Sequence, residues 1–171
     1  LSPLKHLAKW MKKQKPDPLD RAALMRVAVD LLSRREYSRQ ELWRKLSPRA
    51  ADTADVESVL IDLSERHWQS DERFSESFLR SRVARGHGPV RVRQALREKG
   101  IKDELVKQSL DACDQDWYQL ASDVAAKKLA NLKGEPKDIK AKLYRFLAYR
   151  GFSSDQIQTV IERVSIEDTC D

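Results

Sequence analysis

Glycine and proline are scarce in this chain of 171 residues, with five and six copies respectively, and they fall between stretches that carry apolar residues at three- and four-residue spacing. That spacing is typical of helices, and no convincing strand alternation competes with it. The two cysteines, Cys113 and Cys170, are too few and too ill-spaced for a disulfide framework or a zinc site, which points to a reducing cytoplasm. No apolar run approaches the ~18 residues needed to cross a bilayer, which excludes membrane spanning.

Positive charge is unevenly distributed along the chain. There are 33 Lys and Arg against 27 Asp and Glu, a net charge of +6. Residues 1–16 contain five lysines and no acid, whereas residues 80–99 contain seven basic residues against Glu98 alone. The remainder is slightly acidic. The excess of positive charge therefore indicates an anionic partner, which either the basic arm or the central block would bind.

Paired polar residues and prolines predict where four helices begin. A serine followed three residues later by Glu or Gln forms a capping box, and a proline suits the first turn of a helix. The two boxes and the two prolines are Ser38 with Glu41, Ser153 with Gln156, Pro89 and Pro136. Gly100 and Gly151 each follow a basic residue at the expected end of a helix, so the recurring unit is helix, turn, helix.

Apolar positions recur with a period of about 50 residues, longer than in most two-helix solenoids. The matching sets are Val92, Leu96, Gly100, Val106 and Leu110; Leu143, Leu147, Gly151, Ile157 and Ile161; and, without a glycine, Leu42, Leu46, Val56 and Leu60. Another helical stretch precedes each set, near residues 20–35, 71–86 and 116–131. We therefore predict an all-α fold of three tandem three-helix repeats, which form an elongated, curved helical solenoid.

The same period sets the expected boundaries. We expect a basic N-terminal arm at residues 1–18, repeats at 19–69, 70–114 and 115–165, and a C-terminal tail at 166–171. The apolar residues of the arm allow a short amphipathic helix for a membrane surface or a partner, and a disordered basic tail is at least as good an interpretation.

No residue set with the spacing of a catalytic site is found. His6, His67 and His87 lie in different segments without a nucleophile nearby. Cys113 continues the apolar face of its helix, which is typical of a packed thiol. We therefore expect no enzymatic activity, no catalytic residue, no metal ligand and no cofactor.

The central basic block is the strongest local feature. Its members are Arg80, Arg82, Arg85, Arg91, Arg93, Arg97 and Lys99. Arg93 and Arg97 stand four residues apart on one exposed side of the helix expected from Pro89. A solvated face that complements helix dipoles is the plain alternative. The excess of arginine favours forked contacts to the carboxylates or phosphates of a bound surface.

Two further features have a plain structural interpretation. Gly86-His87-Gly88-Pro89 lacks the additional glycine or Gly-Lys-Ser of a nucleotide loop, so we interpret it as a turn leading into a helix. As a weaker alternative, the amides that begin this helix bind a phosphate or a carboxylate. We expect packing or rim positions, in preference to base stacking, for the tryptophans Trp10, Trp43, Trp68 and Trp117.

A continuous series of motifs crosses the centre of the chain. It consists of Asp71-Glu72-Arg73-Phe74-Ser75-Glu76-Ser77-Phe78-Leu79, Arg82, Gly86-His87-Gly88-Pro89, Val92 and Gln94-Ala95-Leu96-Arg97-Glu98-Lys99-Gly100-Ile101. Together with residues 38–46 and 145–152, this series closely resembles the RecX family of recombinase regulators, over nearly everything but the arm. Ser75 replaces an alanine common in the family motif, His87 replaces an aromatic residue, and residues 130–133 look like a local insertion.

The resemblance implies three tandem three-helix repeats and a partner. RecX proteins bind the RecA recombinase, act on its filament on DNA, restrain its ATPase and strand-exchange activities, and can bind DNA themselves. The resemblance does not assign contact residues, so the central basic block remains a hypothesis from charge. We expect a monomeric, cytoplasmic negative regulator of RecA, without a membrane partner, that modulates recombinational DNA repair and the SOS response. The alternative is a DNA-binding helical repeat protein that competes with RecA for single-stranded DNA.

Overall fold

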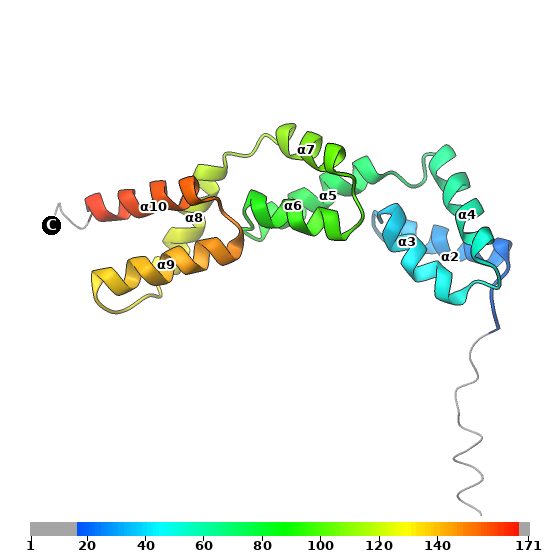
Figure 1. Ribbon diagram of the computed structural model, residues 1–171, viewed down its shortest axis with the longest axis horizontal. Helices are drawn as coiled ribbons and strands as arrows, with labels where there is room; N and C mark the ends of the chain where they lie inside the picture. Colours follow the sequence, from blue (N-terminus) through cyan, green and yellow to red (C-terminus); the bar gives the residue numbers. More distant parts are fainter. Residues whose placement is uncertain (1–16, 168–171) are drawn as a thin grey trace, which may run out of the picture. The chain divides into compact units, whose positions relative to one another are not determined.

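The computed structural model describes residues 17–167, with the backbone alone for residues 165–167. Within this range the chain forms nine α-helices, one short 3-10 helix and no β-strand (Figure 1). The helices are α2 (Arg21–Arg34), α3 (Arg39–Leu46), α4 (Thr53–Glu65), α5 (Asp71–Ala84), α6 (Pro89–Glu98), α7 (Asp103–Asp111), α8 (Trp117–Leu129), α9 (Pro136–Arg150) and α10 (Ser154–Glu167), with the 3-10 helix at Ser47–Arg49. The predicted all-α fold of helix–turn–helix units is confirmed. Residues 1–16 of the expected arm lie outside the described range.

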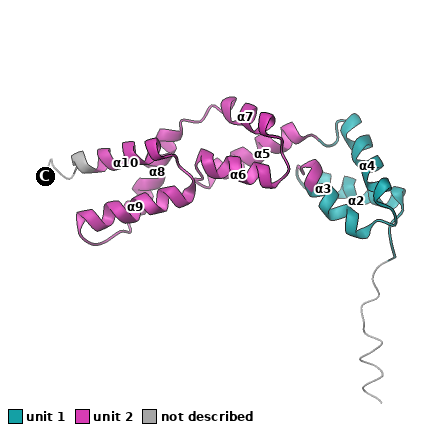
Figure 2. Ribbon diagram, viewed as in Figure 1, with its two compact units in different colours: residues 1–35, 41–69 teal, residues 36–40, 70–171 magenta. Residues whose placement is uncertain are grey.

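The chain divides into two compact units (Figure 2). Unit 1 contains the described residues up to Arg35 and residues 41–69; unit 2 contains residues 36–40 and those from Ser70 onward. Helices α2, α3 and α4 make the first repeat, α5, α6 and α7 the second, and α8, α9 and α10 the third. The short segment 36–40, which leads into α3, thus packs with unit 2.

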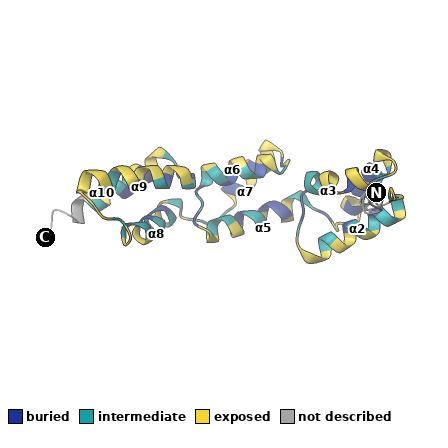
Figure 3. Ribbon diagram, turned by 90° about the horizontal axis from the view of Figure 1, so that it is seen from below, coloured by how far each residue is buried: buried dark blue, intermediate teal, exposed yellow. Residues whose placement is uncertain are grey.

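An apolar core holds the first repeat together. Leu24 and Ala28 of α2 are fully buried, as are Leu42 and Leu46 of α3. Figure 3 shows the buried stretches of the helices in dark blue. Helix α4 completes this core with Val56, Val59, Leu60 and Leu63. Full burial of each of these valine and leucine side chains stabilises the fold by about 1.5–3 kcal/mol. The apolar sets predicted from the sequence are therefore the buried faces of the helices.

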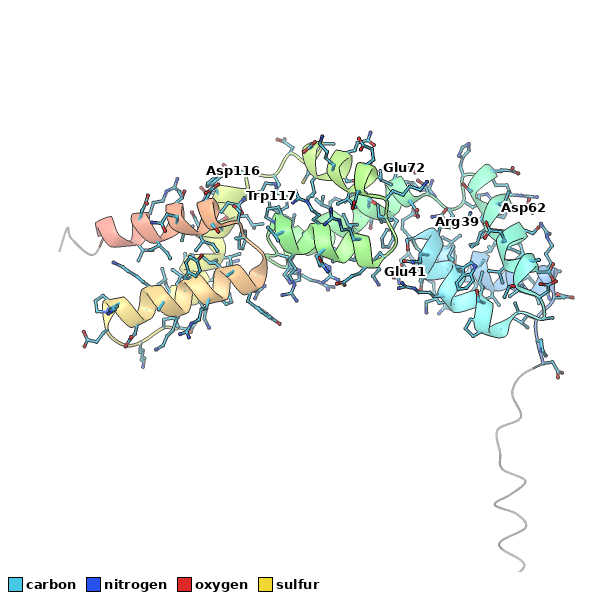
Figure 4. The ribbon with its side chains drawn as sticks, viewed as in Figure 1. Arg39, Glu41, Asp62, Glu72, Asp116 and Trp117 are labelled. Carbon is cyan, nitrogen blue, oxygen red and sulfur yellow. The ribbon has the colours of Figure 1, made fainter. Side chains whose placement is uncertain are left out.

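Unit 2 contains two separate cores, one for each of its repeats. The second repeat buries Phe74, Leu79, Val92, Leu96, Ile101, Val106 and Leu110. The third repeat buries Ala121, Ala125, Leu143, Leu147, Phe152, Ile157 and Val160. Trp117, the first residue of α8, packs against the core of the second repeat and so bridges the two repeats (Figure 4).

The predicted helix starts are largely confirmed. Ser153 N–H donates to Gln156 Oε1 at 2.9 Å, and Gln156 N–H donates to the Ser153 hydroxyl at 3.4 Å, which is the reciprocal pattern of a capping box. Pro89 and Pro136 are the first residues of α6 and α9. Ser38 precedes α3 and makes a longer-range contact, since its hydroxyl donates to the Lys99 carbonyl at 2.7 Å.

The two predicted helix-ending glycines both take the left-handed conformation. Gly100 has φ +80° and Gly151 has φ +86°. After each glycine, the next amide returns to the carbonyl four residues before that glycine: Ile101 N–H donates to Leu96 O, and Phe152 N–H donates to Leu147 O. This geometry satisfies carbonyls that the end of a helix leaves unpaired.

The second and third repeats join where α6 begins and α9 ends. Gly88 N–H donates to Arg150 O at 2.9 Å, and Val90 N–H donates to Gly151 O at 3.0 Å. The backbones lie so close that a Cβ on Gly88 would overlap the Gly151 carbonyl, and one on Gly151 would overlap Arg91. We call this contact the glycine junction.

We predict that Gly88→Ala destabilises the protein by roughly 1–3 kcal/mol, the usual cost of forcing an extra carbon into packed structure. The Gly88 φ of −79° suits alanine, so the cost comes from the missing space. Glu135→Ala is the matched control, because Glu135 also precedes a first-turn proline without making a side-chain cap. Urea unfolding of both variants tests the prediction, and equal stability would show that the junction tolerates a side chain.

Candidate functional site

The seven basic residues predicted as a binding surface lie on α5, α6 and the turns that follow them. Arg80 and Arg82 belong to the last turns of α5, and Arg85 is its C-terminal cap. Arg91, Arg93 and Arg97 belong to α6, which Lys99 caps. We call this set the arginine surface. Its members come from adjacent elements of one repeat, but their environments differ.

Two of these arginines contact aromatic side chains within unit 2. Arg91 Nη1 donates to the Tyr149 carbonyl at 2.8 Å, and its guanidinium lies 4.8 Å from the centre of the Tyr149 ring. The Arg82 guanidinium lies 4.6 Å from the centre of the Phe78 ring. Both side chains are half-buried; Arg91 packs the second repeat against the third, whereas Arg82 packs on a ring of its own helix α5.

Arg97 and Arg93 differ although they stand one turn apart. The Arg97 guanidinium donates to Asp103 Oδ1 at 2.6 Å across the turn to α7. Because both side chains are at least half exposed, this ion pair adds little stability and can exchange for another anion. Arg93 is exposed, and the described residues offer it neither an ion pair nor a hydrogen bond. Val90, one turn before it, is 49% exposed.

His87 lies among four guanidinium groups at the glycine junction. Its Nδ1 is buried and makes no hydrogen bond with any described residue. Burial, followed by the positive charges of Arg91, Arg82, Arg150 and Arg85, lowers the pKa of this imidazole. Arg150 of α9 was missed in the sequence-based prediction because it lies far from the central block. The repeat register relates it to Lys99, and that signal could have found it.

The hydrogen bonds at the start of α6 count against the alternative role of the Gly86–Pro89 turn. The Gly88 and Val90 amides that begin α6 donate to carbonyls of the third repeat, and Pro89 has no amide hydrogen. These groups are therefore not available to a phosphate or a carboxylate. The turn serves the contact between repeats, as the structural interpretation predicted.

The remaining candidates fit structural roles. Cys113 is half-buried against the core of the second repeat, where burial raises the pKa of its thiol. Trp43 and Trp68 are 43% and 47% exposed, as expected of rim positions. Across the part of the chain that the structure describes, no three His, Cys, Asp or Glu side chains gather as metal ligands. None of the described helices is long and apolar enough to cross a membrane.

Models of three RecX family domains match the chain in order. The first three-helix domain of RecX matches residues 25–63, the second matches 70–110, and the third matches 114–161. Each match falls on one of the three repeats described above.

Relatives and solved structures agree with these matches. The chain is 40% identical to a regulatory protein RecX of Chromohalobacter salexigens over 77% of this chain and 86% of that protein. It is 42% identical to a regulatory protein RecX of Neisseria meningitidis over 84% and 94%. The crystal structure of RecX from Lactobacillus salivarius is similar with a TM-score of 0.74 and 24% identity, over 86% of this chain and 97% of that one. That structure supports the fold.

We predict that the protein loses stability on acidification through His87. An imidazole whose pKa is lowered by folding binds fewer protons in the folded state than in the unfolded state. Its full contribution to stability is therefore present above the unfolded pKa of about 6.5 and declines as the pH falls below it. Urea unfolding of wild type and His87→Gln, between about pH 7.5 and pH 5.5, should show a smaller acid-induced loss for the variant. An identical loss would contradict this role of His87.

Proposed function

The chain belongs to the RecX family, and from this premise we propose that it is a negative regulator of the RecA recombinase. It binds the RecA filament on DNA and inhibits the ATPase and strand-exchange activities of that filament. In this way it modulates recombinational DNA repair and the SOS response in the cytoplasm. Its action is binding without catalysis, in keeping with relatives that are named regulatory proteins.

We choose the exposed side of α6 as the contact surface because of the residues that it presents. Arg93 presents there a guanidinium that has neither an ion pair nor a hydrogen bond with any described residue, and the exposed Val90 side chain lies one turn before it. A guanidinium next to a small apolar patch suits a protein partner that presents a carboxylate, because the arginine fork matches the two carboxylate oxygens. Arg97 joins the contact when its exposed pair with Asp103 opens.

A regulator that binds a filament gains from repeated weak contacts. Each filament subunit offers the same surface, so one protein that touches more than one subunit gains avidity without a very strong single contact. Arg80 and Arg85, which are exposed at the end of α5, supply additional positive charge beside α6. This charge also steers the protein towards an anionic nucleoprotein surface.

We predict that Arg93→Glu weakens inhibition of the RecA ATPase on single-stranded DNA. The concentration that gives half-inhibition should rise about tenfold, which corresponds to about 1.4 kcal/mol. Lys107→Glu, the same charge change on an exposed position of α7, is the matched control and should inhibit nearly as wild type does. Equal inhibition by folded Arg93→Glu would reject this contact surface but would leave the family membership intact.

The same assay separates filament binding from competition for DNA. We repeat it with single-stranded DNA in large excess over RecA. Inhibition through the filament should persist, whereas inhibition by competition for strand should vanish as free DNA absorbs the protein. Loss of inhibition would favour the alternative function of a DNA-binding repeat protein.

A further inference from the structure

A groove of about 570 Å³ lies in the first repeat between α2 and the end of α3. Its lining residues are Arg26, Val27, Asp30, Leu31, Lys45 and Arg49. Three of the six are cations, and the single acid, Asp30, already pairs with Arg34 at 3.0 Å. The lining therefore has a clear excess of positive charge.

A second basic groove, of about 480 Å³, lies in the third repeat between α8 and α9, beside the turn that follows α5. The charged residues of its lining are Arg85, Asp123, Lys127, Lys128 and Arg150. Arg150 donates to the Arg85 carbonyl at 2.6 Å, a contact that orients the guanidinium without neutralising its charge. Four cations against one acid again leave an excess of positive charge.

The two grooves occupy the same positions in their repeats. The buried pair of α2, Leu24 and Ala28, corresponds to the buried pair of α8, Ala121 and Ala125. We align α2 with α8 on these pairs, and α3 with α9 on Leu46 and Leu147. In this alignment, all six residues that line the first groove correspond to residues that line the second groove. The counterparts are Arg26 with Asp123, Val27 with Val124, Asp30 with Lys127, Leu31 with Lys128, Lys45 with Phe146, and Arg49 with Arg150.

The excess of positive charge is common to both grooves, although individual charges differ. Arg26 in one groove corresponds to an acid in the other, and Asp30 corresponds to Lys127. Each groove also has an arginine where the second helix of its repeat finishes: Arg49 lies in the 3-10 helix that directly follows α3, and Arg150 is the last residue of α9. A field of one sign without a fixed donor pattern suits a ligand that is recognised by its charge, such as a phosphate.

Among the described residues that line the two grooves, no aromatic ring has a free face. Phe146 lines the second groove, but Lys128 Nζ lies 5.1 Å and the Arg150 guanidinium 5.2 Å from the centre of its ring. Lys45 occupies the corresponding place in the first groove. Bases need an uncovered aromatic ring on which to stack, so the grooves suit phosphates better than bases.

The second repeat differs at the corresponding positions. Counted from its buried pair Ser75 and Leu79, and from Leu96 in the next helix, they hold Ser77, Phe78, Ser81, Arg82, Ala95 and Lys99, so Arg82 and Lys99 are the only cations among these six. The Arg82 guanidinium lies over the Phe78 ring, so this arginine is already engaged. The second repeat instead carries the exposed arginines of α6.

We propose that each of the two grooves binds a backbone phosphate of a nucleic acid strand without reading its bases. A nucleic acid strand carries identical phosphates along its length, so each groove, taken by itself, meets the same kind of ligand wherever a strand reaches it. The leading function assigns a protein contact to α6, whereas this inference gives the DNA binding of the alternative function a place on the chain, and its test does not use RecA.

The test measures binding of the full chain to fluorescein-labelled oligo(dT) by anisotropy across a salt series. Arg26→Glu with Arg49→Glu alters the first groove, and Lys127→Glu alters the second. The matched controls make the same charge changes at two exposed residues, Lys102, which precedes α7, and Lys107 within α7: Lys102→Glu with Lys107→Glu, and Lys107→Glu alone. Circular dichroism confirms that each variant is folded.

Each groove variant should bind about tenfold or more weakly than its matched control. The slope of log affinity against log salt should fall by about 1 as phosphate contacts are lost. A mixed-sequence oligonucleotide should give the same values as oligo(dT). Equal losses in groove and control variants would show that only net charge matters, and would overturn the proposal.

Competition identifies the kind of anion. Unlabelled oligo(dT) should displace the labelled strand far better than inorganic phosphate or poly-glutamate at equal charge concentration. If poly-glutamate competed equally well, the grooves would be sites for acidic protein segments and the proposal would be wrong. Absence of wild-type binding would also overturn it, while the Arg93→Glu assay would still test the proposed function separately.

Discussion

The close contact of two backbones at Gly88 and Gly151 fixes how the second and third repeats pack together. Two amides at the start of α6 donate to carbonyls at the end of α9, and these hydrogen bonds can form only where both side chains are absent. The contact places His87 among guanidinium groups and brings the turn after α5 against α8. One side of the groove in the third repeat is that turn, so the groove depends on the glycine junction.

At the glycine junction some arginines hold the two repeats together, whereas a neighbouring arginine is exposed for binding. Arg91 and Arg150 reach across it in opposite directions, each donating to a carbonyl of the other repeat. Arg93, two residues after Arg91, projects from α6 without such a contact. The amino-acid composition does not distinguish Arg91, Arg93 and Arg150. Their free energies of interaction with a ligand differ, because an arginine that already holds two repeats together must keep or replace those contacts on binding.

The sequence predicted the fold well because the signals were local. The signals for helix starts and helix ends depend on residues within a few positions of one another. They are Pro89, Pro136, the Ser153–Gln156 capping box and the two glycines that end helices, and the structure contains all of them. The candidate site was less predictable. The pair of Arg97 with Asp103 crosses a turn, and the contact of Arg150 with Arg85 spans two repeats. Such contacts depend on tertiary packing, which charge spacing along one helix does not encode.

The repeats share the same buried helix packing but differ in their surface residues, and the packing explains this difference. Small residues such as Ala28 and Ala125 are buried in the packed interior, so their size is constrained. Arg26 and Asp123 are exposed at matched positions, where opposite charges leave the packing unchanged. One three-helix unit can therefore present a basic groove in the first and third repeats and an exposed arginine face in the second. A filament of protein on nucleic acid offers carboxylates and phosphates together, and these two kinds of surface suit both groups.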